Sequence, residues 1–406
     1  MKIVLITLLC FISSLQAKVE LGIDRLFKEE YSPLLKGKRV GLITNQTGMN
    51  SHFKSTIQLF KERHREFTLV ALFSPEHGLN GAIYAAEDVA DARDAEGIVI
   101  YSLHGKTRRP TDKMLKGIDV LVYDIQEIGC RSYTYASTLF YAMEEAAKHH
   151  IPVIVLDRPN PINGVIVDGP MMKEKWRSFV GYINVPFCHG MTIGELAHFF
   201  NGEYNIKCKL HVVPMSGWKR EMSFKETGLP WIPPSPYIPE PDTPLFNATT
   251  GILGDLGFVN IGIGYTLPFK LVGAPWINGE EFASHLNAQK LPGVRFVPIY
   301  YTPFYGSFKN KECQGVKIIV TDSLKYRPVA VQYLMLGLLK TLYPKEVQKK
   351  VDVLSESQKK LFCQVNGNEE ILSLLLHEKY IAWPLINFQE EERKAFMQIR
   401  ENYLLY

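Results

Sequence analysis

The strongest constraint on the fold is the alternation of short apolar runs with helical stretches in the first half of the chain. The runs that we expect to be strands are residues 40–44, 69–73, 98–102, 119–124 and 153–156. Strands that are apolar along their length are buried on both faces, as in parallel sheets crossed by helices. One such helix is expected over residues 135–150, where Leu139, Met143 and Ala146 recur at helical spacing. The pattern predicts an α/β fold that begins with an open, Rossmann-like parallel sheet.

A proline-rich segment follows this half of the chain. Residues 228–244 contain seven prolines, which excludes a helix or a central strand and favours a semi-rigid connector or a loop over a groove. Beyond it, strands are expected over residues 295–300 and 316–321, and helices over residues 329–342 and 369–377. We therefore predict a Rossmann-like domain over residues 18–244 and a smaller α/β (α+β) domain over residues 245–406 that completes a cleft.

The start of the chain has the pattern of a secretory signal peptide. Lys2 precedes an apolar stretch, residues 3–12, and small or polar residues continue to Ala17. Because the stretch is too short to cross a membrane, we expect a signal peptide over residues 1–17, its cleavage, and a periplasmic or secreted protein. A buried N-terminal strand is the alternative.

Cysteine usage indicates no cross-linked framework. Five cysteines remain after the signal peptide: Cys130, Cys188, Cys208, Cys313 and Cys363. Their odd number and irregular spacing fit neither a set of disulfides nor a zinc site. We expect buried free thiols, with one or two disulfides at most as the alternative.

Charge and motifs exclude several functional classes. The 46 basic and 42 acidic residues give a net charge of only +4, which argues against a nucleic-acid partner. The sequence contains no dinucleotide-binding glycine motif, no Walker A motif, no His-Glu-x-x-His and no Gly-x-Ser-x-Gly. We expect no cofactor, no metal and, after signal cleavage, no membrane span.

Polar residues follow each of the expected strands. In chain order they are Asn45 and Gln46, Glu76 and His77, His104, Asp124, Gln126 and Glu127, and Asp157, Arg158 and Asn160. Ligands of open parallel sheets bind beyond the carboxyl ends of the strands. These loops therefore predict a polar cleft.

The most distinctive of these loops contains Glu76 and His77, framed by Pro75 and Gly78. A tight turn at a strand end can hold a carboxyl group for general acid or base catalysis. A helix N-cap or a plain surface turn is the alternative.

Further candidates lie in residues 124–135 and beyond. Arg131 offers a planar fork for a carboxylate, and Tyr133 and Tyr135 offer flat faces, which together suit a sugar that bears an acid. An ion pair between Asp124 and Arg131 that supports the helix start is the alternative. Asp157, Arg158 and Asn160 fit either ligand contacts or structural turns. His189 precedes a helical stretch in which Thr192 and Glu195 form a capping box, so Thr192 is interpreted as structural.

Several stretches together resemble the NamZ-type exo-β-N-acetylmuramidase family. They are residues 41–48 (GLITNQTG), 72–78 (LFSPEHG), 119–126 (DVLVYDIQ), 131–135 (RSYTY), 156–164 (LDRPNPING), 168–170 (DGP), 186–192 (PFCHGMT), 273–276 (GAPW) and 326–329 (YRPV). The resemblance implies a Rossmann-like domain, a smaller C-terminal domain and an active site between them. It also implies release of N-acetylmuramic acid from the non-reducing ends of peptidoglycan fragments, with Glu76 as the catalytic glutamate.

One region departs from the family pattern. An ungapped alignment back from Gly273 places Asp255 where the family has a glutamate and Ile263 where it has an arginine. A shorter carboxylate and a missing guanidinium would face the same bound sugar. We therefore expect weakened turnover of standard muramic acid glycosides.

These observations lead to a glycosidase with named site residues. Glu76 would protonate the leaving oxygen, His77 would orient it, and Asp124 or Glu127 would be the second carboxylate, unless the acetamido group of the substrate is the nucleophile. Arg131 or Arg158 would pair with the lactyl carboxylate of muramic acid saccharides. The predicted catalytic residues are Glu76, His77 and Glu127, and the predicted substrate-binding residues are Asn45, Asp124, Gln126, Arg131, Tyr133, Tyr135, Asp157, Arg158, Asn160 and His189. The alternative is a catalytically reduced cell-wall sugar-binding protein of the same fold.

Overall fold

A seven-stranded sheet in the order β3-β4-β2-β1-β5-β6-β7 organises the first half of the chain. The computed structural model describes residues 19–84 and 87–406. The strands are β1 (Arg39–Thr44), β2 (Thr68–Ser74), β3 (Ala92–Arg93), β4 (Val99–Ser102), β5 (Val120–Asp124), β6 (Val153–Leu156) and β7 (Leu210–Val213). All neighbours pair in parallel except β3 and β4. The predicted Rossmann-like α/β sheet is confirmed, and β3 and β7 extend it at its two edges.

Helices cover both faces of this sheet. They are α1 (Gly22–Arg25), α2 (Thr56–Glu62), α3 (Asp112–Leu115), α4 (Thr134–Lys148) and α5 (Ile193–Glu203), with 3₁₀ turns at Ser32–Leu34, Glu174–Trp176, Phe224–Thr227 and Glu401–Tyr403. Side chains alternate along each strand, so Leu121 and Tyr123 of β5 pack with α4 and α5, whereas Val120 and Val122 pack with the α1 and α2 side. Burial on both faces explains why the strands are apolar throughout.

The second half of the chain forms a smaller lobe around a three-stranded antiparallel sheet in the order β8-β10-β9. Its strands are β8 (Leu271–Ala274), β9 (Val294–Tyr301) and β10 (Cys313–Val320). Its helices are α6 (Thr243–Leu256), α7 (Gly279–Ala288), α8 (Pro328–Leu342), α9 (Pro344–Val351), α10 (Glu356–Asn366), α11 (Glu370–His377) and α12 (Ala382–Ile386), and α13 (Glu390–Arg400) follows. The boundary predicted after residue 244 falls in the first turn of α6, and the division into domains stays a prediction.

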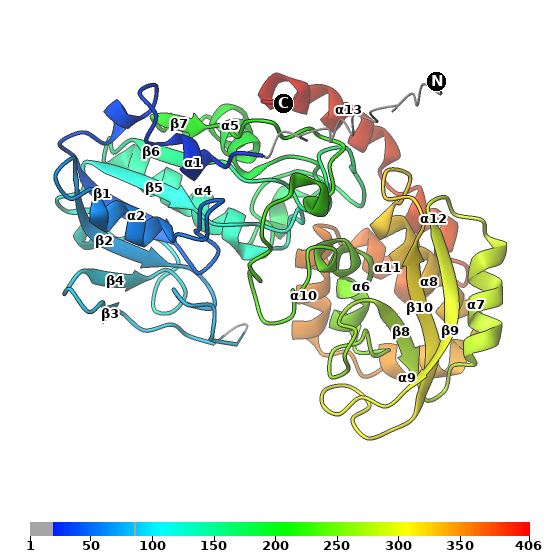
Figure 1. Ribbon diagram of the computed structural model, residues 1–406. Coiled ribbons are helices and arrows are strands. Elements are labelled where there is room, and N and C mark those ends of the chain that lie inside the picture. The colour runs from blue at the N-terminus through cyan, green and yellow to red at the C-terminus, as the bar shows by residue number, and fades with distance from the viewer. Residues whose placement is uncertain (1–18, 85–86) are drawn as a thin grey trace, which may run out of the picture.

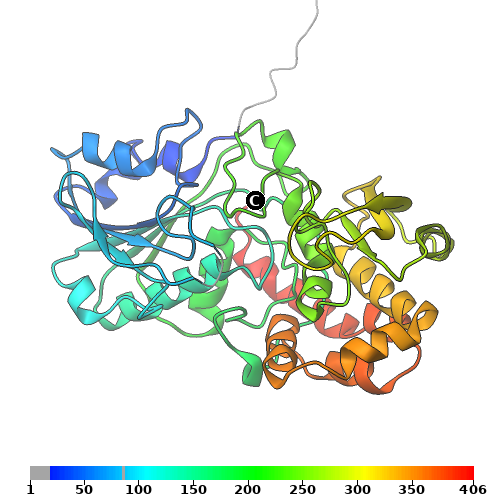
Figure 2. The same cartoon turned by 90° about the horizontal axis from the view of Figure 1, so that it is seen from below.

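The two lobes lie side by side (Figures 1 and 2), and polar contacts lock them together. Asp168 accepts hydrogen bonds from the backbone N–H groups of Val329 (2.9 Å) and Ala330 (3.0 Å) at the start of α8. The last helix, α13, returns to the N-terminal lobe (Figure 1), where Arg400 donates to the carbonyl groups of His189 and Gly190. Relative motion of the lobes would have to break these buried bonds.

The remaining chain-level predictions have different outcomes. The five cysteines among the described residues are buried and carry free thiols, as predicted. The signal peptide expected over residues 1–17 lies outside the described residues. Among the helices of residues 19–84 and 87–406, none has the length and apolar character needed to cross a membrane.

Candidate active site

A cleft of about 540 Å³ lies between the two lobes. The N-terminal lobe contributes the loops after β2 and β5, and the smaller lobe contributes α6, α10 and the loop between α6 and β8. The proline-rich connector forms a further wall. The polar residues of the lining are Glu76, His77, Ser132, Tyr133, Thr134, Ser235, Tyr237, Asn247, Asp255, Asn260 and Ser307.

Glu76 faces this cleft from the turn that follows β2. His77 (φ 70°) and Gly78 (φ 76°) both adopt the left-handed conformation, which turns the chain sharply and is unusual for a histidine. The Thr134 hydroxyl, in the first turn of α4, donates a hydrogen bond of 2.6 Å to Glu76 Oε2. A histidine from the loop after β4 approaches the other oxygen of this carboxyl group. Three segments that are distant in sequence therefore meet at Glu76.

That histidine is His104, from the loop after β4. Its Nε2 lies 3.8 Å from Glu76 Oε1, and burial lowers the pKa of the imidazole. His77 also lines the cleft, but its Nδ1 lies 2.7 Å from the carbonyl oxygen of Ile83. The role of His77 in orienting the acid stays a prediction, and His104 is a second imidazole close to the Glu76 carboxyl group.

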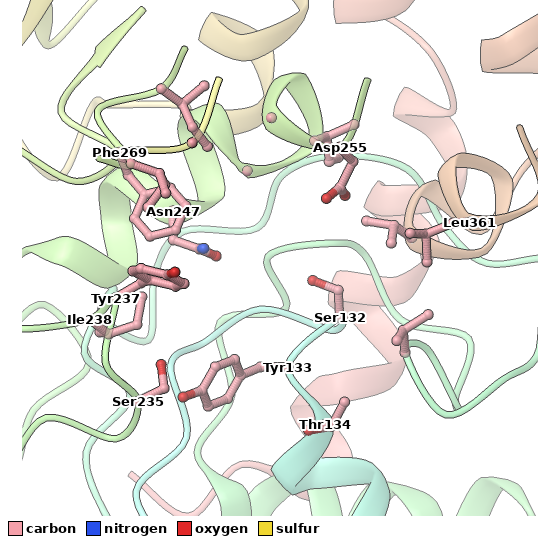
Figure 3. Close-up of a pocket in the computed structure, with 18 of the residues that line it drawn as sticks. Ser132, Tyr133, Thr134, Ser235, Tyr237, Ile238, Asn247, Asp255, Phe269 and Leu361 are labelled. Carbon is pink, nitrogen blue, oxygen red and sulfur yellow. The ribbon is translucent and has the colours of Figure 1, made fainter. Parts of the chain in front are cut away.

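The connector is held over the sheet by residues of the N-terminal lobe. The Tyr135 hydroxyl donates to the carbonyl oxygen of Pro234 (2.6 Å), and Gln46 donates to that of Pro233 (2.9 Å). These bonds bring Ser235 and Tyr237 into the lining beside Tyr133 (Figure 3). Tyr133 thus faces the cleft as predicted, whereas Tyr135 is buried and structural.

Asp255 faces the cleft from the last turn of α6, on the lobe opposite Glu76. Figure 3 shows its carboxyl group pointing into the open space toward Ser132. The side chain is open to the cleft, but the surrounding protein raises the pKa of its carboxyl group to about 7 by desolvation. Ile263 lines the same cleft. The two positions at which the sequence departs from the family pattern therefore share one cleft with Glu76.

Ten of the thirteen predicted site residues do not line this cleft. They are Glu127, Asn45, Asp124, Gln126, Arg131, Tyr135, Asp157, Arg158, Asn160 and His189. All ten are buried. Their polar atoms hold the loops of the N-terminal lobe to one another.

Asp124 and Asp157 show this structural role most clearly. Arg158 Nε donates to Asp124 Oδ1 at 2.6 Å. Asp157 accepts hydrogen bonds from the Thr192 hydroxyl (2.8 Å) and the Gly194 N–H (2.8 Å), and so caps α5. Burial raises the pKa of Asp157 to about 7. Neither carboxylate has an oxygen in the cleft, so Asp124 is not the second catalytic carboxylate.

Glu127 is excluded from that role for the same reason. Its side chain is 2% exposed, its Oε2 accepts a hydrogen bond from the Gly129 N–H, and burial raises the pKa of the carboxyl group to about 8. His189 is also enclosed, and burial lowers its pKa to about 3. Both predictions are corrected, because these groups face the protein interior.

The amide side chains and Arg131 bind backbone groups. Asn45 accepts from Thr47 N–H (2.9 Å), Gln126 donates to the Pro159 carbonyl (2.8 Å), and Asn160 donates to the Met191 carbonyl (3.0 Å). Arg131 donates to the carbonyl groups of Pro170, Val185 and Val365 at 2.6–3.0 Å. Both Arg131 and Arg158 already bind groups of the protein. The expected pairing of either arginine with a lactyl carboxylate is therefore corrected.

Sequence reasoning missed much of the cleft. Ser235 and Tyr237 lie in the connector and Asn247 lies just beyond it, and no strand-end pattern points to them. His104 was recognised as a polar residue that follows a strand, but it was not placed among the site residues, although its strand lies next to that of Glu76. No group of three or more His, Cys, Asp or Glu side chains able to hold a metal ion occurs within the described parts of the chain.

Comparison with known proteins adds the family. Two family models match, those of the N-terminal and C-terminal parts of the exo-β-N-acetylmuramidase NamZ, over residues 40–242 and 246–406. The chain is 40% identical over 390 residues to the peptidoglycan β-N-acetylmuramidase NamZ of Bacillus subtilis (strain 168), covering 96% of this chain and 92% of that protein.

Two crystal structures of DUF1343 family proteins from Bacteroides fragilis NCTC 9343 have similar folds. The first is 42% identical with a TM-score of 0.89, and the second is 27% identical with a TM-score of 0.75. Each comparison covers 96% of this chain and 99% of the other. The chain therefore belongs to the NamZ family of exo-β-N-acetylmuramidases, and it is a glycoside hydrolase.

Proposed function

We propose that this protein is an exported exo-β-N-acetylmuramidase that releases N-acetylmuramic acid from the non-reducing ends of peptidoglycan fragments. The observation that carries the proposal is the position of Glu76, whose carboxyl group faces the cleft while Thr134 and His104 flank its two oxygens. The relationship to a peptidoglycan β-N-acetylmuramidase over 96% of the chain supports the substrate class.

In this mechanism Glu76 is the general acid. Glycoside hydrolysis passes through an oxocarbenium-like transition state, and protonation of the leaving oxygen makes bond cleavage possible. The Thr134 hydroxyl holds one carboxyl oxygen of Glu76 and so limits rotation of the group. A fixed acid at the reacting oxygen is worth about a hundredfold or more in rate.

Asp255 is the carboxyl group on the opposite wall of the cleft. In its ionised form it would stabilise positive charge on the sugar ring or activate a water molecule. Because desolvation raises its pKa to about 7, this ionised form becomes dominant only above neutral pH. The acetamido group of the substrate is the other candidate for the attacking group, as in substrate-assisted glycosidases.

Export is supported by the N-terminal sequence. Lys2, the apolar residues 3–12 and the small residues up to Ala17 have the order of a cleavable signal peptide. Peptidoglycan lies outside the cytoplasmic membrane, so a periplasmic or secreted location would bring the enzyme to its substrate.

Product analysis tests the proposed function. The mature protein is incubated with purified peptidoglycan saccharides that carry muramic acid at the non-reducing end, and products are identified by mass spectrometry. We expect free N-acetylmuramic acid as the first product, and saccharides capped by N-acetylglucosamine should stay intact. Internal cleavage into oligosaccharides, or binding of the saccharides without any product, would contradict the proposal.

A further inference from the structure

The ionisable acidic groups that the cleft offers its ligand are two carboxyl groups. Glu76 and Asp255 face it from opposite lobes. No lysine or arginine side chain is among the residues that line it within the described chain. The lining on the smaller lobe is largely apolar and includes Ile252, Val259, Ile261, Ile263, Leu361 and Val365.

The arginines of the surrounding loops do not line the cleft, and Arg108, whose charge acts on His104, lies over the ring of Phe179 at 4.4 Å. Arg131 donates to three backbone carbonyl groups, and Arg158 pairs with Asp124 and donates to the Met49 carbonyl at 2.8 Å. A ligand carboxylate in this cleft would lose its water without gaining a cation, and it would be repelled by Asp255. A free lactyl carboxylate is therefore mismatched to this site.

Uncharged hydrogen-bonding groups fit the same walls well. Ser132 and Asn247 point into the cleft and offer a hydroxyl and a carboxamide (Figure 3). When it is ionised, the Asp255 carboxylate only accepts hydrogen bonds. It can therefore accept one from an amide N–H of the ligand. The apolar residues beside it can contact the alkyl part of an amide substituent.

Resting on the proposed function, we propose that this enzyme selects muramic acid units whose lactyl carboxyl group is amide-linked, as in a peptide stem, over units with a free lactyl carboxylate. Asp255 accepts the N–H of that amide, and Ile263 provides an apolar contact. The specificity thus lies on the smaller lobe, while the acid lies on the larger one.

The test compares two nitrophenyl glycosides of N-acetylmuramic acid, one with a free lactyl carboxyl group and one with the N-methylamide of that group. Both are measured above pH 7, where the free lactyl carboxyl group is ionised. We expect the wild-type kcat/KM for the amide to exceed that for the acid by about tenfold or more, the scale of one lost charge interaction. Ile263→Arg should raise kcat/KM for the acid and reverse this preference. The uncharged control Ile263→Gln removes the apolar contact without adding a cation, so it should not raise kcat/KM for the acid. Equal values, or a preference for the acid in the wild type, would overturn the inference.

A binding measurement separates this inference from the proposed function. Calorimetry with Glu76→Gln compares N-acetylmuramic acid with its N-methylamide, so it reads the preference without turnover. If neither glycoside is hydrolysed but the amide binds more tightly, the proposed function fails and the inference stands. If the acid binds as tightly or more tightly, the inference fails, whether or not hydrolysis occurs.

Discussion

Two polar regions lie at the carboxyl edge of the large sheet, and they differ in what their carboxyl groups face. In the first region, the cleft, Glu76 and Asp255 point into open volume. In the second region, the buried network of Asp124, Arg158, Asp157, Thr192 and Tyr406, the oxygens of both carboxylates accept hydrogen bonds from protein groups. Asp124 and Asp157 are fully buried, so their carboxylates are enclosed by protein. Accessibility, and not polar density, distinguishes the catalytic region from the structural one.

The largest effect is expected for Glu76→Gln in the cleft. Loss of the general acid should lower kcat by about a hundredfold or more, with no change in the urea midpoint, because the amide keeps the shape of the side chain and can still accept a hydrogen bond from Thr134. Activity is measured with the preferred nitrophenyl glycoside. Glu29→Gln, an exposed glutamate in the same lobe, is the matched control and should match the wild type. A variant with near-normal kcat would remove Glu76 from the mechanism.

In the buried network, Arg158→Met should affect stability and not catalysis. Arg158 is 5% exposed and Asp124 is 0% exposed in their side chains, so the substitution leaves a buried carboxylate without its cationic partner. We expect the free energy of unfolding to fall by about 3 kcal/mol or more, measured by urea titration.

The matched control for this prediction is Arg39→Met. Arg39 pairs with Asp119 at the surface, where the side chains are 57% and 32% exposed, so the cost should be about 1 kcal/mol or less. If Arg158→Met instead kept its stability and lost substrate affinity, the network would be a binding site and the comparison would be reversed.

The effect expected from Glu127→Gln depends on pH. Burial raises the pKa of Glu127 from 4.5 to about 8, so between these values the folded protein binds a proton that the unfolded chain releases. This group's contribution to the free energy of unfolding therefore falls as pH rises through that window, by about 1.4 kcal/mol per pH unit at most.

The glutamine variant removes this titration. The free energy of unfolding of the variant, relative to that of the wild type, should rise from pH 4.5 to about pH 8. Urea unfolding at these two pH values measures the difference. A difference that is constant with pH would show that Glu127 is not a buried titrating group. A large loss of kcat in the folded variant would return it to the catalytic candidates.

The sequence predicted the large sheet because its physical cause is local. Strands such as β5 and β6 are buried on both faces and are therefore apolar throughout. The edge strand β7 was missed because Leu210 and His211 are only partly buried, and the polar His211 interrupts its short apolar run. The start of α6 was hidden by the prolines before it, although Pro244 is well suited to the first turn of a helix.

The site was predictable only in part. The turn around Glu76 is framed by a proline and a glycine, so it could be recognised from the local sequence without knowing which residues surround it in the fold. By contrast, Asp157 and Asn160 have the same residue types as ligand-binding loops, and only the fold shows that Thr192 and Met191 are their partners. Asp255 could be noticed only as a departure from a family pattern, because an acidic residue in a helix has no signal of its own.

The central claim is that catalysis takes place in the cleft at Glu76 and not at the buried network. A crystal structure of Glu76→Gln with a bound muramic-acid-capped saccharide tests it most directly. We expect the sugar between residue 76 and Asp255, with the glycosidic oxygen about 3 Å from the side-chain amide of residue 76. A saccharide bound against Arg158 and Asp157, or one whose glycosidic oxygen lies far from residue 76, would contradict the claim.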